Sequence, residues 1–249
     1  MLCVMPSDVF DEWVAQRYDR LWPELFDPAV VDPAVRFLAD LAGTGAALEF
    51  GIGTGRIALP LSRRGVRVHG IERSPAMVGQ LRQRSAGTDI GVTIGDFARA
   101  TVDATFGLVH LVRNTITNLT TQDEQVGAFR NAAAHLRAGG CFVIENYSPA
   151  LQRLPPGETT HVFTATSTHL GFEEYDVAAQ TAVSHHYWMI DGQLKAFSSP
   201  HRYVWPAELD LMARLAGLTL RERWGGWNRE PFTSTSRSHV SVWEKPNAG

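Results

Sequence analysis

A glycine-rich turn between a short apolar segment and a helix constrains this sequence more than any other feature. Residues 48–56, LEFGIGTGR, leave the apolar run at Phe50 and carry Gly51, Gly53 and Gly55. Because glycine has no Cβ, the backbone can turn sharply here and approach a ligand closely. In open α/β sheets, ligands bind beyond the carboxyl ends of the strands. The turn therefore predicts a site for a nucleotide-like cofactor.

The remaining pattern predicts an α/β fold. Short apolar segments such as 66–71 and 106–112 alternate with helical segments such as 75–84 and 122–136. Strands that alternate with helices form right-handed crossovers and a parallel sheet. We therefore expect a doubly wound, Rossmann-like, mostly parallel sheet of seven strands, whose last two strands are antiparallel to each other.

The 249 residues are expected to form a single domain with four parts. After Pro149 the chain becomes rich in β-branched and aromatic residues, and Asp191-Gly192 favours a hairpin turn. The parts are an N-terminal helical lid (1–45), a cofactor-binding core (46–148), an antiparallel β insertion that serves as a substrate lid (149–205), and a closing helix with two strands (206–249).

The spacing of the glycines decides between cofactors. A dinucleotide-binding turn has the pattern G-x-G-x-x-G, but here the third glycine comes one residue early and Arg56 takes the last position. This spacing argues against a nicotinamide-dependent dehydrogenase. No Gly-Lys-Ser/Thr follows, so a P-loop is excluded as well. Glu49 leads the loop, and its carboxylate repels a pyrophosphate but can pair with an ammonium group. The loop therefore points to S-adenosylmethionine.

Two later acidic residues fit the same cofactor. Glu72 ends the next predicted strand, 23 residues after Glu49, and is expected to accept the ribose hydroxyls. Asp96 follows the third strand and is expected to meet the adenine amino group, with Phe97 stacked on the ring. Further candidate contacts are Arg73, which follows Glu72, and Arg113, which follows the fourth strand.

Four segments together resemble the class I S-adenosylmethionine-dependent methyltransferases: LEFGIGTGR, VHGIERSPAMV, IGDF and AFRNAAAHLRAGGCFVIE. The resemblance covers residues 46–146, although Ala138 replaces the proline that is usual in the last segment. It supports cofactor contacts from Glu49, Gly51, Gly53, Glu72 and Asp96. It also implies that the Met77 side chain covers the adenine.

The methyl acceptor is expected beyond the fourth strand, where residues 108–119 run from apolar side chains into amides and hydroxyls. This segment resembles that of the deoxyaminosugar N-methyltransferases, which carry Ser-Ser-Ile-Gly-His/Tyr-Leu. Their histidine or tyrosine falls on Asn118, which cannot accept a proton as a base does. The segment RYDRLW is similar to that group's Tyr-Asp start, which closes over the cofactor, and implies that Tyr18 is an active-site side chain.

The insertion holds five histidines within about 40 residues, which raises the question of a metal. His185 and His186 are neighbours on a strand and point to opposite faces. They cannot bind one ion without a bulge, so no metal is expected. One histidine of the insertion, His186 or His201, is instead a candidate base for the acceptor.

Composition limits the partners. The net charge is −3 without a run of basic residues, which argues against a nucleic acid. The sequence does not begin with the basic and then apolar residues of a signal peptide, and it contains no apolar segment of about 18 residues that could span a membrane. We therefore expect a cytoplasmic protein without membrane contact. The predicted activity is methyl transfer to nitrogen or oxygen of a small molecule, with a secondary metabolite suggested. The alternatives are a non-catalytic cofactor-binding regulator and a methyltransferase acting on a peptide.

Overall fold

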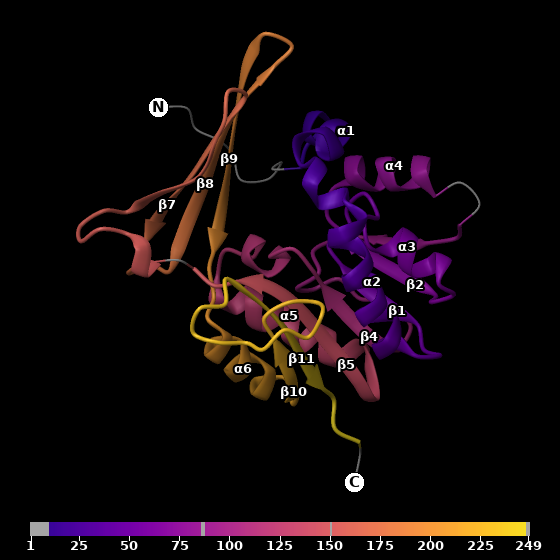
Figure 1. Ribbon diagram of the computed structural model, residues 1–249. Helices are drawn as coiled ribbons and strands as arrows, with labels where there is room; N and C mark the ends of the chain where they lie inside the picture. The colour runs from indigo at the N-terminus through magenta and orange to yellow at the C-terminus, as the bar shows by residue number, and fades with distance from the viewer. Residues whose placement is uncertain (1–9, 86–87, 150, 248–249) are drawn as a thin grey trace.

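A central sheet of seven strands forms the framework of the protein (Figure 1). The computed structural model describes residues 10–85, 88–149 and 151–247. The strands lie in the order β10-β11-β5-β4-β1-β2-β3, and β11 runs antiparallel to both of its neighbours, whereas the other pairs are parallel. Their bounds are β1 Ala47–Phe50, β2 Val68–Glu72, β3 Gly91–Ile94, β4 Phe106–Leu111, β5 Leu136–Tyr147, β10 Thr219–Trp224 and β11 Ser238–Glu244. The predicted Rossmann-like, mostly parallel sheet is confirmed.

Helices pack on both faces of this sheet. On one face, α2 (Pro28–Ala42), α3 (Ala58–Arg63) and α4 (Pro75–Arg84) contribute to one buried apolar cluster. On the other, α5 (Gln122–His135) and α6 (Pro206–Leu215) contribute to a second. The strands supply alternate residues to the two clusters, as the pleat requires. Within the described ranges, no helix has the length and apolar character needed to cross a bilayer.

The predicted helix at 75–84 begins with the cap that its sequence indicates. The Ser74 hydroxyl accepts the backbone N–H of Met77 at 3.2 Å, and Pro75 takes the first helical position. This cap fixes the direction of α4 directly after β2. The turn between β2 and α4 therefore lies beside the glycine-rich turn.

The boundary between α5 and β5 differs from the prediction. The sequence predicts a helix over 122–136, but α5 ends at His135 and β5 already begins at Leu136. Gly139 adopts φ of +70° within the strand, and the ladder with β4 shifts register near its start. Lys245 donates to two carbonyls at the end of α5, so the helix does not need the glycines to end it.

A second sheet is inserted between β5 and α6. Its strands lie in the order β6-β7-β8-β9, and each pair is antiparallel. Asp191 and Gly192 form the β8–β9 turn with φ of 51° and 73°, the left-handed pair that an Asp-Gly hairpin requires. The bounds are β6 Thr160–Ala165, β7 His169–Asp176, β8 Thr181–Ile190 and β9 Gln193–Arg202. The predicted antiparallel insertion is confirmed.

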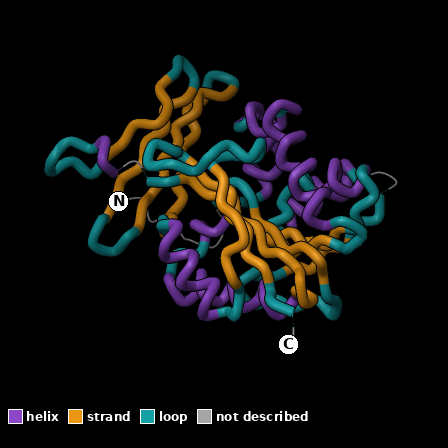
Figure 2. The backbone as a smooth tube through the Cα atoms, turned by 60° about the horizontal axis from the view of Figure 1, so that its bottom comes forward, coloured by secondary structure: helices purple, strands orange, loops and turns teal. Residues whose placement is uncertain are grey.

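The two sheets are separate blocks of strands (Figure 2). A buried polar anchor joins them. Arg202, at the end of β9, pairs with Glu208 of α6 at 2.7 Å and donates to the side chain of Gln125 in α5. Gln125 in turn donates to the carbonyl of Ile116, in the loop after β4. The anchor therefore fixes the second sheet relative to the carboxyl end of β4.

The amino-terminal helix α1 (Glu12–Leu21) and the 3-10 turn η1 (Pro23–Phe26) bridge the other end of the second sheet. Trp22, between them, packs edge-on against Trp188 with ring centroids 5.3 Å apart. Arg20 pairs with Asp191 at the hairpin turn in an exposed contact. Residues 1–9 of the predicted N-terminal lid lie outside the described residues.

Candidate active site

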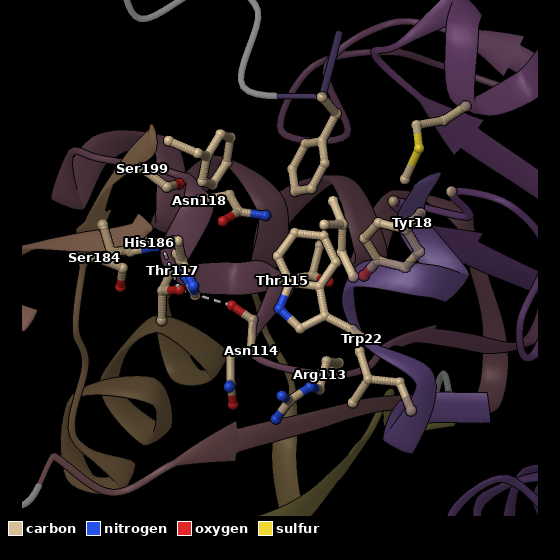
Figure 3. A pocket seen from close by; sticks show the side chains of 18 of the residues that line it. Tyr18, Trp22, Arg113, Asn114, Thr115, Thr117, Asn118, Ser184, His186 and Ser199 are labelled. Atoms are coloured by element: carbon tan, nitrogen blue, oxygen red, sulfur yellow. Dashed lines mark hydrogen bonds between the residues drawn. The ribbon is translucent and has the colours of Figure 1, made fainter. Parts of the chain in front are cut away.

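A cavity of about 1710 Å³ lies between the carboxyl ends of the core strands, α1 and the second sheet. Figure 3 shows Tyr18 and Trp22 on the side of α1, and Ser184, His186 and Ser199 on the side of the second sheet. The cavity is lined by every candidate site residue named from the sequence except Gly55: Tyr18, Glu49, Gly51, Gly53, Arg56, Glu72, Arg73, Met77, Asp96, Phe97, Arg113, Asn118, His186 and His201.

The glycine-rich turn forms one wall with its backbone. Gly51 adopts φ of +67°, and a Cβ there would lie 2.7 Å from the Thr115 side chain. A side chain at this position is therefore excluded both by strain and by space. Gly55 also has a positive φ, but its Cα faces Leu59 and Leu81. The structure gives Gly55 a helix-packing role away from the cavity.

Glu49 is a buried carboxylate at the entrance to this turn. Its side chain is 3% exposed, and its Oε2 has no hydrogen-bond partner among the described residues. Burial raises the pKa of Glu49 to about 8, against the opposing charge of Arg56. A buried acceptor without a partner is costly unless a ligand supplies the donor. Glu49 therefore fits the ammonium group of S-adenosylmethionine.

Glu72 ties the glycine-rich turn to the end of β2. Its Oε2 accepts the backbone N–H of Gly53 at 2.9 Å, and its Oε1 accepts that of Ser74 at 2.8 Å. Burial raises the pKa of Glu72, and the two backbone donors oppose this shift. The carboxylate is therefore held rigidly at the edge of the cavity, where ribose hydroxyls can reach it.

The adenine end of the predicted site is partly occupied by the protein itself. Phe97 stacks on Phe50 with ring centroids 5.6 Å apart, so one face of the ring belongs to the core. Asp96 accepts the backbone N–H of Ala98 at 2.9 Å, and this bond orders the turn after β3. The Met77 side chain lies near Gly53, where its Cε would be 3.7 Å from an added Cβ. The remaining edge of Phe97 lines the cavity.

Protonation of Glu49 gives a first test of the cofactor site. With a pKa of about 8, against an ordinary value of 4.5, Glu49 is mostly protonated in the free protein at pH 7. A cofactor ammonium group favours the charged carboxylate and lowers this pKa. Binding of S-adenosylhomocysteine is therefore expected to release close to one proton at pH 7 and progressively fewer above pH 8.

Calorimetry in two buffers of different ionisation enthalpy measures this release. The Glu49→Gln variant has no proton to lose and serves as the control. Binding by the unaltered protein without proton release at pH 7 would contradict the assignment of Glu49.

The loop after β4 is strained where it enters the cavity. Arg113 and Asn114 adopt φ of 55° and 61°, values that residues other than glycine rarely adopt. The Arg113 N–H donates to the carboxylate of Glu145 at 2.7 Å, and the Asn114 amide oxygen accepts the Tyr147 N–H at 2.8 Å. These bonds from β5 hold the strained turn. They aim the short helix η2 (Thr115–Asn118) at the second sheet.

Tyr18 lies in an aromatic cluster between the two halves of the cavity. Its ring is 5.0 Å from that of Trp22 and 6.1 Å from that of Phe26, centroid to centroid. Burial raises the pKa of the Tyr18 hydroxyl, and the charges of Arg56 and Arg113 oppose this shift. Tyr18 is therefore a neutral hydroxyl, able to donate one hydrogen bond and to accept others.

Two histidines of the second sheet face the cavity in neutral form. Burial lowers the pKa of His186 to about 4, helped by the neighbouring His169, and burial alone lowers that of His201 to about 4. The His186 ring stacks on Trp188 at 4.8 Å and shares a hydrogen bond of 2.9 Å with His169. His201 lies 3.4 Å from the Thr117 hydroxyl of η2.

His185 and His186 do point to opposite faces of β8. His185 contacts Ser198 at 2.8 Å on the outer face, whereas His186 lines the cavity. In the described part of the chain, no group of three or more potential ligands is arranged to hold a metal ion. Sequence reasoning missed Trp22 and Glu173, which also line the cavity. For Glu173, the available signal is its spacing of two residues from Tyr175, which places both side chains on one face of a strand.

The fold and the glycine-rich turn define a Rossmann-like enzyme that binds a nucleoside cofactor, and comparison with known proteins narrows this class. A methyltransferase domain family matches residues 47–140, from the start of β1 into β5. The CcbJ methyltransferase from Streptomyces caelestis is 36% identical, with a TM-score of 0.87 over 98% of this chain and 100% of that one. The chain belongs to the S-adenosylmethionine-dependent methyltransferases, and S-adenosylmethionine is its cofactor.

Two further proteins are similar over most of their length. The cypemycin N-terminal methyltransferase of a Streptomyces species is 29% identical over 95% of this chain and 98% of that protein. An amino pentose methyltransferase from Micromonospora echinaspora, solved with S-adenosylmethionine bound, is 20% identical with a TM-score of 0.69 over 92% of this chain and 96% of that one. The latter extends the resemblance to the deoxyaminosugar enzymes from the sequence to the fold.

Proposed function

We propose that this enzyme transfers the methyl group to an amine nitrogen of a small-molecule acceptor. The observation that carries the proposal is the pair of neutral histidines, His186 and His201, in the cavity wall, whose pKa values of about 4 make them weak bases for removing a hydroxyl proton. An amine has a lone pair ready for attack once it is unprotonated, whereas a hydroxyl needs a base to remove its proton. The substrates in the names of two similar proteins, a peptide N-terminus and an amino pentose, also offer amines.

In this proposal the core sheet holds the cofactor and the second sheet holds the acceptor. Glu49 pairs with the ammonium group, the turn at Gly51 and Gly53 approaches the cofactor closely, and Glu72 receives the ribose. Asp96, Phe97 and Met77 form the adenine end, with Arg56, Arg73 and Arg113 at the rim. The cofactor supplies a methyl group that positive sulfur has already activated. The protein contributes alignment of the nitrogen with that methyl group and exclusion of water.

Three side chains orient the acceptor in this proposal. Tyr18 of α1 offers a hydroxyl to the cavity, and Asn118 of η2 offers an amide. His186 accepts a hydrogen bond from the acceptor N–H through Nε2 when its Nδ1 donates to His169. This bond turns the nitrogen lone pair towards the methyl group. Asn118 cannot take a proton from the acceptor. An amine acceptor tolerates the lack of a base better than a hydroxyl acceptor does.

Transfer of radiolabelled methyl to a panel of small amines and to the alcohols of the same shape tests the proposal. Label is expected in the amines and not in the alcohols. Labelling of the alcohols alone would overturn the choice of nitrogen. Failure to label any member of a broad amine panel would overturn the small-molecule acceptor.

Replacement of His186 by alanine is expected to lower kcat about tenfold. The effect should fall below the range of roughly 10² to 10⁴ that is typical of an obligatory proton transfer, because His186 orients the nitrogen and does not remove its proton. Affinity for S-adenosylhomocysteine should stay the same. His185→Ala, on the outer face of the same strand, is the matched control. Equal kcat in the two variants would remove His186 from the mechanism.

A peptide N-terminus is the second candidate acceptor. The similarity to the cypemycin N-terminal methyltransferase extends over nearly the whole of both chains. The cavity, at about 1710 Å³ including the cofactor half, also exceeds the 300–1000 Å³ usual for a single small ligand. Methylation of short peptides with a free N-terminus, but not of their acetylated forms, would favour this reading over a metabolite.

A further inference from the structure

A polar row crosses the inner face of the second sheet. In the antiparallel ladders His161 lies opposite Glu173, Glu173 opposite Ser184, and Ser184 opposite Ser199. Directly opposed residues share one face of a sheet, and all four residues line the cavity. Ser184 of this row lies two residues before His186 on β8, a separation of about 7 Å along the strand.

Glu173 is the acidic member of this row. Of the three acids in the described strands β6 to β9, Glu174 and Asp176 are exposed and do not line the cavity, whereas Glu173 is half-buried and does. Its carboxylate accepts hydrogen bonds from the Tyr175 hydroxyl and, at 3.2 Å, from the Ser184 hydroxyl. Within the described residues, no Lys, Arg or His nitrogen lies within ion-pair distance of it.

Most other carboxylates of the cavity already serve the backbone or the cofactor. Asp11 and Glu124 cap α1 and α5, Asp96 orders the turn after β3, and Glu49 and Glu72 belong to the cofactor half. Glu173 caps no helix and orders no turn. It is a half-buried charge whose protein partners are neutral hydroxyls, an arrangement that costs free energy unless a cation compensates it.

Among the described residues, no side chain forms an ion pair with Glu173 that would supply such a cation. The groups that face it from the packed elements are Tyr147 of β5, His161 of β6, Tyr175 of β7, Ser184 of β8, and Ser199 and His201 of β9. Burial, and then the Glu173 charge, raise the pKa values of Tyr147 and Tyr175, so both hydroxyls stay protonated. In the described part of the second sheet, the wall of the cavity therefore carries one carboxylate, Glu173, with hydroxyl donors beside it.

We propose that Glu173, with Tyr175 and Ser184, is the binding site for an organic ammonium group, the amine of the methyl acceptor. This inference rests on the proposed function and narrows the acceptor to amines that are cationic in solution. The bound ammonium loses one proton to water. Its nitrogen lone pair then forms the N–CH₃ bond while the C–S bond breaks, and that electron pair stays on sulfur.

The positive charge therefore returns to the nitrogen and stays on the methylammonium product. A carboxylate beside the nitrogen stabilises this charge as it develops. A hydroxyl acceptor has no lasting positive charge for Glu173 to stabilise. Glu173 is thus a residue that selects nitrogen over oxygen.

Binding of a matched pair of probes tests this site without turnover. At pH 7.5, cyclohexylamine is an ammonium ion and cyclohexanol is its neutral counterpart of similar shape. Ligand-observed NMR with the protein saturated in S-adenosylhomocysteine should show tighter binding of the amine. Glu173→Gln should weaken the amine about tenfold and leave the alcohol unchanged. Glu174→Gln, which removes an exposed charge from the same strand, should change neither.

Unaltered S-adenosylhomocysteine affinity shows that Glu173→Gln is folded. Ser184→Ala, which removes one hydroxyl donor from the carboxylate, is a second variant and should weaken the amine to a smaller extent. Equal amine affinity in the unaltered protein and Glu173→Gln would overturn the site. Amine binding that depends on Glu173, without methylation of any amine, would leave the site standing and overturn the proposed function alone.

Discussion

Replacement of Glu72 by alanine is expected to weaken binding of S-adenosylhomocysteine about a hundredfold. The carboxylate holds the glycine-rich turn through the Gly53 N–H and the start of α4 through the Ser74 N–H. Without it, the turn must be ordered by the cofactor, and the ribose loses its acceptor. Two charge-assisted hydrogen bonds of roughly 1.5 kcal/mol each correspond to about two factors of ten in affinity.

Isothermal titration measures this loss. Glu72→Gln retains the shape and one acceptor oxygen, so it should lie between alanine and the unaltered protein. The free energy of unfolding should change by less than the free energy of cofactor binding, because the turn lies at the edge of the core. Alanine and glutamine variants that both bind as tightly as the unaltered protein would contradict a role for Glu72 in cofactor binding.

Replacement of Arg202 by alanine is expected to lower the free energy of unfolding by roughly 3–5 kcal/mol, the usual cost of breaking a buried ion pair. Its side chain is 9% exposed and that of its partner Glu208 is 17% exposed. Removal leaves Glu208 without its cation and Gln125 without a donor to its amide oxygen. Because Gln125 also bonds to η2, the loss should disturb the acceptor side of the cavity.

Chemical denaturation followed by tryptophan fluorescence checks this value. Arg221→Ala is the matched control, since the Arg221–Glu244 pair is 47% and 37% exposed. Such a surface pair contributes about 1 kcal/mol or less. Equal destabilisation by the two variants would show that the anchor between the sheets does not depend on the buried pair.

The part of the cavity that we propose for the cofactor could be located from sequence because its geometry is local. A strand, a glycine-rich turn and a helix follow one another within about a dozen residues, so Glu49, Gly51 and Gly53 are fixed by neighbouring peptide units. The acid at the end of β2 is placed by the parallel pairing of β1 and β2. The packing role of Gly55 was harder to predict, because its neighbour Leu81 lies 26 residues further along the chain.

The acceptor half could not be predicted in the same way. The row from His161 to Ser199 depends on the register of three ladders, and β6 and β7 contain a shift that sequence does not specify. A slip of one residue would turn Glu173 outwards and Glu174 inwards. Trp22 faces a strand more than 160 residues away, and nothing in its local sequence indicates this contact.

The antiparallel ladder of the second sheet has a consequence for how acceptor range can change. Backbone hydrogen bonds set its register, whereas alternate side chains such as Ser184 and His186 line the cavity. Exchange of these side chains alters the shape and polarity offered to an acceptor without moving a strand. In the proposed arrangement a different sheet holds the methyl donor, so side chains on the second sheet can be exchanged to accept new substrates while affinity for the donor is retained.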